Sequence, residues 1–74
     1  MPTEAEELVR QFQDAGFRVD YRSTAVTRLV HHAHPGVEVR IGTVYLVVAR
    51  DERELYRAPL RSANLATALS RLRA

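Results

Sequence analysis

The chain has 74 residues, no cysteine, no tryptophan and a formal net charge of +2. This length predicts that residues 1–74 form a single small domain, and the lack of cysteine excludes disulfides and cysteine-based metal sites. No apolar run approaches the ~20 residues of a membrane-spanning helix, and the polar, acidic start is unlike a secretory signal, so we expect a soluble, cytoplasmic protein.

A first helix is expected between Thr3 and Gly16. Thr3 and Glu6 form a capping box, in which each side chain accepts a hydrogen bond from a free backbone N–H of the other residue. One apolar face recurs at helical spacing and comprises Ala5, Leu8, Val9, Phe12 and Ala15. Gly16 can take the left-handed conformation that ends a helix, and we expect Phe17 to fold back on Phe12.

Two strands are expected next. The first is half buried because its apolar and polar residues alternate: Phe17, Val19 and Tyr21 with Arg18, Asp20 and Arg22. A turn at Ser23–Thr24 leads to a second strand from Val26 to His34, whose alternation is less regular. Pro35 and Gly36 then favour a type II turn, because proline presets the first central residue and glycine accepts positive φ at the second.

The stretch from Val37 to Val48 is rich in valine and predicts sheet structure on both sides of Gly42–Thr43. These two residues form either a two-residue hairpin turn or a bulge within one long strand. The hairpin is preferred because it places three apolar pairs on one face: Ile41 beside Val44, Val39 beside Leu46, and Val37 beside Val48. The second strand is apolar on both faces, which implies a second layer or a partner chain.

The rest of the chain predicts a turn at Asp51–Glu52–Arg53, a short edge strand from Glu54 to Ala58, and a second helix capped by Ser62. The buried stripe of that helix would consist of Leu65, Leu69 and Leu72. The resulting order, α-β-β-β-β-(β)-α, predicts an α+β fold. We expect an antiparallel meander sheet with the N- and C-terminal helices packed on one face.

The uncovered face of this sheet is the expected place for function. Its candidate interaction residues are Arg18, Arg22, Arg40, Tyr45 and Val47. In the preferred hairpin Arg40 lies opposite Tyr45 and can stack on its ring. Arg57 and Arg61 are candidate nucleic-acid contacts, because guanidinium groups bind phosphates. Asp20 and Glu38 would share the face and neutralise part of its positive charge.

His31, His32 and His34 form the only cluster with metal-ligand chemistry. His32 and His34 would share one face of a strand, but two imidazoles without a third nearby ligand do not predict a metal site. The three glycines are isolated and no serine lies in a nucleophile elbow. We therefore expect no enzyme activity, no cofactor, no metal and no small-molecule substrate.

The short helix ending in Ala15–Gly16–Phe17, the histidine-bearing hairpin, the Pro–Gly turn and the closing helix resemble the small HicA-type toxin domains, over residues 4–41. The resemblance implies a fold related to double-stranded-RNA-binding domains and cleavage of messenger RNA by a single histidine. The Gly-Ser-His element of that family is replaced here by Ser23–Thr24–Ala25, and the later strand material has no counterpart. An RNA-targeting toxin is therefore a remote alternative.

These features favour a non-enzymatic protein-interaction or regulatory module. A small domain without disulfides or metal gains buried area most readily by self-association, so we expect a homodimer or a host-protein partner. The alternative is a weak nucleic-acid-binding protein that uses an arginine-bearing sheet face; no membrane partner is expected. All eleven basic residues are arginine, which is typical of a high-GC coding sequence such as that of an actinobacterium or its phage.

Overall fold

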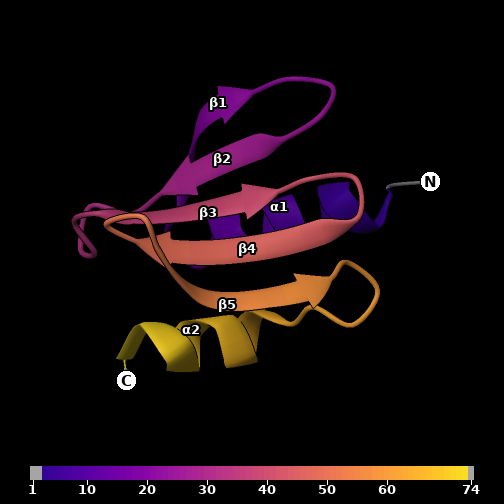
Figure 1. Cartoon of the computed structure of the whole chain (residues 1–74). Coiled ribbons are helices and arrows are strands. Elements are labelled where there is room, and N and C mark those ends of the chain that lie inside the picture. The colour runs from indigo at the N-terminus through magenta and orange to yellow at the C-terminus, as the bar shows by residue number, and fades with distance from the viewer. Residues whose placement is uncertain (1–2, 74) are drawn as a thin grey trace.

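The computed structural model describes residues 3–73. In chain order its elements are helix α1 (Glu4–Asp14), strands β1 (Arg18–Arg22), β2 (Thr27–Val30), β3 (Val37–Ile41), β4 (Tyr45–Arg50) and β5 (Arg53–Pro59), and helix α2 (Leu65–Arg73). The strands form one antiparallel sheet in the order β1-β2-β3-β4-β5 (Figure 1). The predicted α+β meander is confirmed, and its last strand, predicted as a short strand from Glu54 to Ala58, is the longest of the five at seven residues. Within the described range, neither helix has the length and apolar character needed to cross a membrane.

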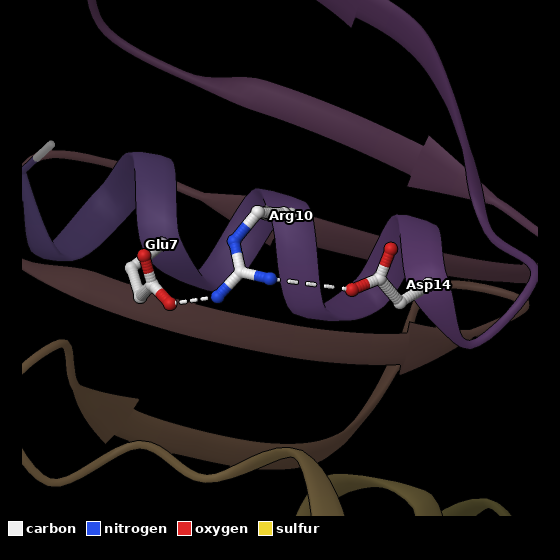
Figure 2. Close-up of polar contacts among 3 residues, drawn as sticks. All are labelled: Glu7, Arg10 and Asp14. Atoms are coloured by element: carbon white, nitrogen blue, oxygen red, sulfur yellow. Dashed lines mark hydrogen bonds and ion pairs between the residues drawn. The ribbon is translucent and has the colours of Figure 1, made fainter.

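Helix α1 begins at the predicted capping box. The Thr3 hydroxyl accepts a hydrogen bond from the Glu6 amide at 3.1 Å, and the Glu6 carboxylate accepts one from the Thr3 amide at 3.1 Å. On the solvent side of α1, Arg10 lies between Glu7 and Asp14 and pairs with both (Figure 2). These exposed ion pairs keep one face of α1 in water, and the opposite, apolar face packs on the sheet.

The core lies between the helices and the inner side of the sheet. Figure 1 shows α1 behind the sheet and α2 beside β5. The most deeply buried side chains come from both helices and from strands β2 to β4: Phe12, Leu29, Val39, Ile41, Leu46, Val48 and Ala68. Leu72 of the predicted α2 stripe is also buried, while Leu65 and Leu69 are half-buried against the core. The Phe17 ring packs edge-on against Phe12 at 5.3 Å between ring centroids, as predicted.

Strand β1 contains a bulge that the sequence pattern did not reveal. Val19 pairs with Leu29, but two residues later Tyr21 pairs with Arg28, so the register shifts between them. An extra residue reverses the alternation that follows it. Tyr21 therefore points away from the core and is 52% exposed. The prediction that Tyr21 shares the apolar face of Val19 is wrong.

Strand β2 is shorter than predicted, because it ends at Val30 and not at His34. The His34 amide donates a hydrogen bond to the carbonyl of His31 at 3.0 Å, so this segment is a turn and not part of the sheet. The type II turn predicted after His34 is present, with Gly36 at a φ of 81°. The strand prediction failed here because residues 31–34 are three histidines and an alanine, which fit a turn as well as a strand.

The hairpin predicted after Ile41 is present, but its turn lies one residue later. Gly42 donates its amide hydrogen to the carbonyl of Tyr45 at 3.0 Å, which leaves Thr43 and Val44 as the turn. The predicted partners are therefore wrong, and each residue of β3 pairs two positions further along β4: Ile41 with Leu46, Val39 with Val48, and Val37 with Arg50. A shift of two residues leaves every side chain on the same face, so the apolar pattern could not distinguish the two registers.

The hairpin between β4 and β5 turns at Asp51 and Glu52, whereas Arg53, the third residue of the predicted turn, already belongs to β5. Both residues have positive φ, at 50° and 70°, and the flanking Arg50 and Arg53 pair with each other. These features define a two-residue turn whose twist matches that of the flanking strands. This hairpin contains a second bulge: Val48 pairs with Tyr56 and Ala49 pairs with Glu54, so β5 has one extra residue at this step.

Helix α2 is capped by Asn64 and not by Ser62, so that prediction is wrong. The Asn64 side-chain oxygen accepts a hydrogen bond from the Thr67 amide at 2.9 Å. The Ser62 hydroxyl instead donates to the carbonyl of Pro59 at 3.3 Å. The amides of Ser62 and Ala63 also bond to that carbonyl, so a turn occupies this segment before the helix starts.

Replacing Asn64 with alanine should lower the free energy of unfolding by about 1 kcal/mol, because the amide at the start of α2 loses its side-chain acceptor. The matched variant Ser62→Ala should cost less than about 0.5 kcal/mol, since an exposed hydroxyl loses only a long bond to a turn carbonyl. Urea denaturation followed by circular dichroism measures both. An equal or larger loss for Ser62→Ala would show that the cap is wrongly placed.

Candidate functional site

The side of the sheet that faces away from the core is the candidate site, and we call it the outer face. Its side chains alternate along each strand with the buried residues of the core, as a pleated sheet requires. Among residues 3–73, the described helices both contribute to the core on the other side. The outer face is therefore a five-stranded surface whose side chains are free to meet a partner.

Two rows of side chains cross the outer face. The arginine row is defined by successive cross-strand pairs and consists of Tyr21, Arg28, Arg40, Val47 and Arg57. The glutamate row is formed by the next outward-facing residue of each strand and consists of Arg18, Val30, Glu38, Ala49 and Glu54. Near the middle of each row lies an apolar residue of β4, Val47 in one and Ala49 in the other, and both are half-buried. Basic, apolar and acidic groups are therefore ordered across this surface.

Three carboxylates of the outer face, Asp20, Glu38 and Glu54, pair with the arginines of the arginine row. Every arginine of the arginine row has a carboxylate partner: Arg28 pairs with Asp20 (2.9 Å) and Glu38 (3.6 Å), Arg40 with Glu38 (2.5 Å), and Arg57 with Glu54 (2.9 Å). The hydrogen bond from Arg57 to Glu54, together with the charge of that carboxylate, raises the pKa of Arg57 above its ordinary value. Exposed pairs of this kind contribute little stability individually. These ion pairs hold positive and negative groups at fixed positions beside one another on the outer face.

Two tyrosines of the outer face, Tyr21 of β1 and Tyr45 of β4, each lie beside an arginine. The Arg28 guanidinium lies 5.8 Å from the centre of the Tyr21 ring, and the Arg57 guanidinium lies 5.5 Å from the centre of the Tyr45 ring. The predicted stacking of Arg40 on Tyr45 is wrong, because the shifted hairpin register places Val47 opposite Arg40. Tyr45 is stacked by an arginine of the neighbouring strand β5 instead.

The structure brings most of the predicted site residues together. Arg18, Arg40, Tyr45, Val47 and Arg57 belong to the outer face, and Arg61 follows β5 beside a hollow that Tyr45 also lines.

Arg22 does not join the outer face. It pairs with Thr27, which in turn pairs with the buried Ile41, so Arg22 lies on the helix side of the sheet. There it lines a hollow with Ala5 and Val9 of α1. The bulge in β1 causes this correction, because it exchanges the faces of Tyr21 and Arg22.

Sequence reasoning missed Tyr21 and Arg28 as outer-face residues. A signal existed for Arg28, since it stands between Thr27 and the buried Leu29 and so must face outward in any strand that buries Leu29. The uneven apolar pattern of that strand hid the signal. No local feature of the sequence marks the bulge that turns Tyr21 outward.

The three histidines gather around Phe17 in the turn after β2. The His31 ring lies 4.9 Å from Phe17, 4.9 Å from His32 and 5.0 Å from His34, measured between ring centroids. The Ala33 amide donates a hydrogen bond to His31 Nδ1 at 3.0 Å, which fixes the orientation of that ring. Over the part of the chain that the structure describes, no three histidine or carboxylate side chains are placed to hold a metal ion. The cluster packs as an aromatic group at the edge of the core.

Comparison with known proteins identifies no relative. The chain matches no protein-family model, no curated protein and no solved structure.

Proposed function

We propose that this protein is a small cytoplasmic protein-interaction module without catalytic activity, and that it acts as a homodimer joined through the outer face. Support comes from one observation above all: Val47 and Ala49 form a half-buried apolar centre inside a border of tyrosines and paired charges. Protein interfaces have this composition, with an apolar centre, a polar rim, and an excess of tyrosine and arginine.

The charge arrangement favours a protein partner over a nucleic acid. A phosphate-binding face needs arginines whose charge is available. Arg28, Arg40 and Arg57 are each neutralised by a carboxylate on the same face, and those carboxylates would repel a phosphate backbone. A protein partner can carry groups of both signs, so it can pair with the arginines and with the carboxylates of this face at the same time. A second copy of the chain supplies both signs without any further component.

Sedimentation equilibrium tests the proposal. We expect reversible dimers with a Kd between about 1 and 500 µM, the range of modest protein interfaces. Val47→Glu should weaken the dimer at least about tenfold, because it replaces the apolar centre of the interface with a carboxylate that loses its hydration on burial, even beside Arg40 and Arg57. Ala49→Glu should do the same, which guards against a folding defect in either variant. Val44→Glu is the matched control, since Val44 lies in the β3–β4 turn, is 59% exposed and is not a member of either row.

Three outcomes would overturn the proposal. A strict monomer across this concentration range would exclude the homodimer. Equal dimerisation of the wild type, Val47→Glu and Ala49→Glu would place the interface on another surface. Salt-dependent binding of single- or double-stranded oligonucleotides by the monomer, lost in Arg40→Ala, would favour the nucleic-acid alternative.

A further inference from the structure

We propose that two copies pack outer face to outer face about a two-fold axis that crosses the strands between the arginine row and the glutamate row. This inference depends on the proposed homodimer and specifies which side chains meet. In such a dimer the arginine row of each copy lies over the glutamate row of the other. The rows thereby act as a self-complementary surface, which a two-fold interface requires.

The choice of axis follows from the order of charges. In the aligned arrangement of two packed sheets the strands stay roughly parallel to one another, and the axis can then run either across the strands or along the central strand β3. An axis across the strands places every strand over the same strand of the second copy and exchanges the two rows. An axis along β3 keeps each row over itself and exchanges β1 with β5 and β2 with β4.

The axis across the strands matches opposite charges. Arg40 then faces Glu38 of the second copy, because both residues lie on β3 in different rows. On β5, Arg57 faces Glu54 of the second copy in the same way. Between these two sites, Val47 faces Ala49 of the second copy. Two charged contacts therefore enclose an apolar one, and the symmetry produces each contact twice.

The axis along β3 brings like charges together. Arg40 would lie over Arg40 of the second copy, and Glu38 over Glu38, at the centre of the interface. Like charges opposed in this way disfavour association strongly. The order of the residues on the outer face therefore selects the axis across the strands.

The existing ion pairs make this packing feasible. Burying a lone charge is costly, but each carboxylate here already holds a guanidinium of its own chain: Arg40 with Glu38 at 2.5 Å and Arg57 with Glu54 at 2.9 Å. In the dimer, two such pairs meet with their charges alternating around a ring of four. Five strands about 4.8 Å apart span only about 19 Å, so the two faces hide on the order of 1,000 Å², which predicts a weak, reversible dimer.

A charge exchange confined to β5 tests the axis. Arg57→Glu and Glu54→Arg should each weaken their own homodimer at least about tenfold, because the four charges where the two β5 strands meet are then all alike. An equimolar mixture should form a heterodimer with nearly wild-type affinity, since acidic and basic copies are again matched. The double variant Glu54→Arg/Arg57→Glu should restore the homodimer. Native mass spectrometry with one copy labelled with ¹⁵N separates the species, and circular dichroism confirms that each variant is folded.

The outcomes distinguish this inference from the proposed function. With the axis along β3, Glu54 would face Arg18 of the second copy. Mixing the two variants would then not restore the affinity that each homodimer has lost. A wild-type dimer that depends on Val47, without rescue in the mixture, would keep the homodimer and overturn the axis. A wild type that stays monomeric would overturn both. Rescue in the mixture together with recovery in the double variant is the result that we expect.

Discussion

Replacing Phe12 with alanine is expected to have the largest effect of any single substitution on stability. The Phe12 ring is fully buried and packs edge-on against Phe17. Removing a buried phenylalanine side chain costs about 3–5 kcal/mol, through lost burial and the cavity that remains. A domain of this size has a total stability of only about 4–11 kcal/mol. Phe12→Ala should therefore lose between about a quarter and all of its folding free energy, as measured by urea denaturation.

Two matched variants show whether burial causes this loss. Phe12→Leu keeps most of the apolar volume and should cost about 1–2 kcal/mol. Tyr21→Ala removes an aromatic ring that is 52% exposed on the outer face, and it should cost less than about 1 kcal/mol. If Tyr21→Ala and Phe12→Ala lowered the urea midpoint equally, the assignment of the inner and outer faces would be wrong.

The architecture could be predicted because it depends on local signals that agree with one another. The capping box of Thr3 and Glu6 places the start of α1, and the glycine at position 16 places its end. The Pro–Gly turn and the alternation from Val37 to Ile41 place β3. Each signal involves residues only a few positions apart, so the sequence alone carries it. Local agreement of this kind is characteristic of sequences that fold to one structure.

The candidate site was predicted less well because it depends on register, which is not local. A hairpin shifted by two residues buries the same side chains, so the pattern cannot show that Arg40 meets Val47 and that Tyr45 is stacked by Arg57. The bulge in β1 likewise leaves no mark in the alternation, yet it moves Tyr21 onto the outer face and Arg22 off it. The site is thus defined by pairings between strands, and only the folded sheet specifies them.

These pairings also explain why the two apolar faces of β4 have different roles. Leu46 and Val48 face the core and are fully buried, whereas Val47 and Ala49 face outward and are half-buried. The sequence predicts that a strand with two apolar faces needs cover on both. The helices supply one cover, and the proposed second copy supplies the other.

Gly16→Ala is expected to lower the free energy of unfolding by about 3 kcal/mol, from backbone strain and overpacking together. Gly16 has a φ of 101°, which a residue with a Cβ rarely adopts. A Cβ at this position would also lie 2.6 Å from Nε2 of His31. The His31 ring cannot easily move aside, because it packs edge-on against Phe17 and its Nδ1 accepts the Ala33 amide hydrogen at 3.0 Å.

A double-mutant cycle separates the two causes. In a His31→Ala background the Cβ introduced at position 16 no longer meets a ring, so Gly16→Ala should cost only the backbone strain, about 1–2 kcal/mol. The difference between the two backgrounds, measured by urea denaturation, is the contribution of the contact with His31. An identical cost in both backgrounds would mean that the ring yields freely. The histidine cluster would then be a loose surface group, and not the packed corner that fixes the end of α1 against the turn after β2.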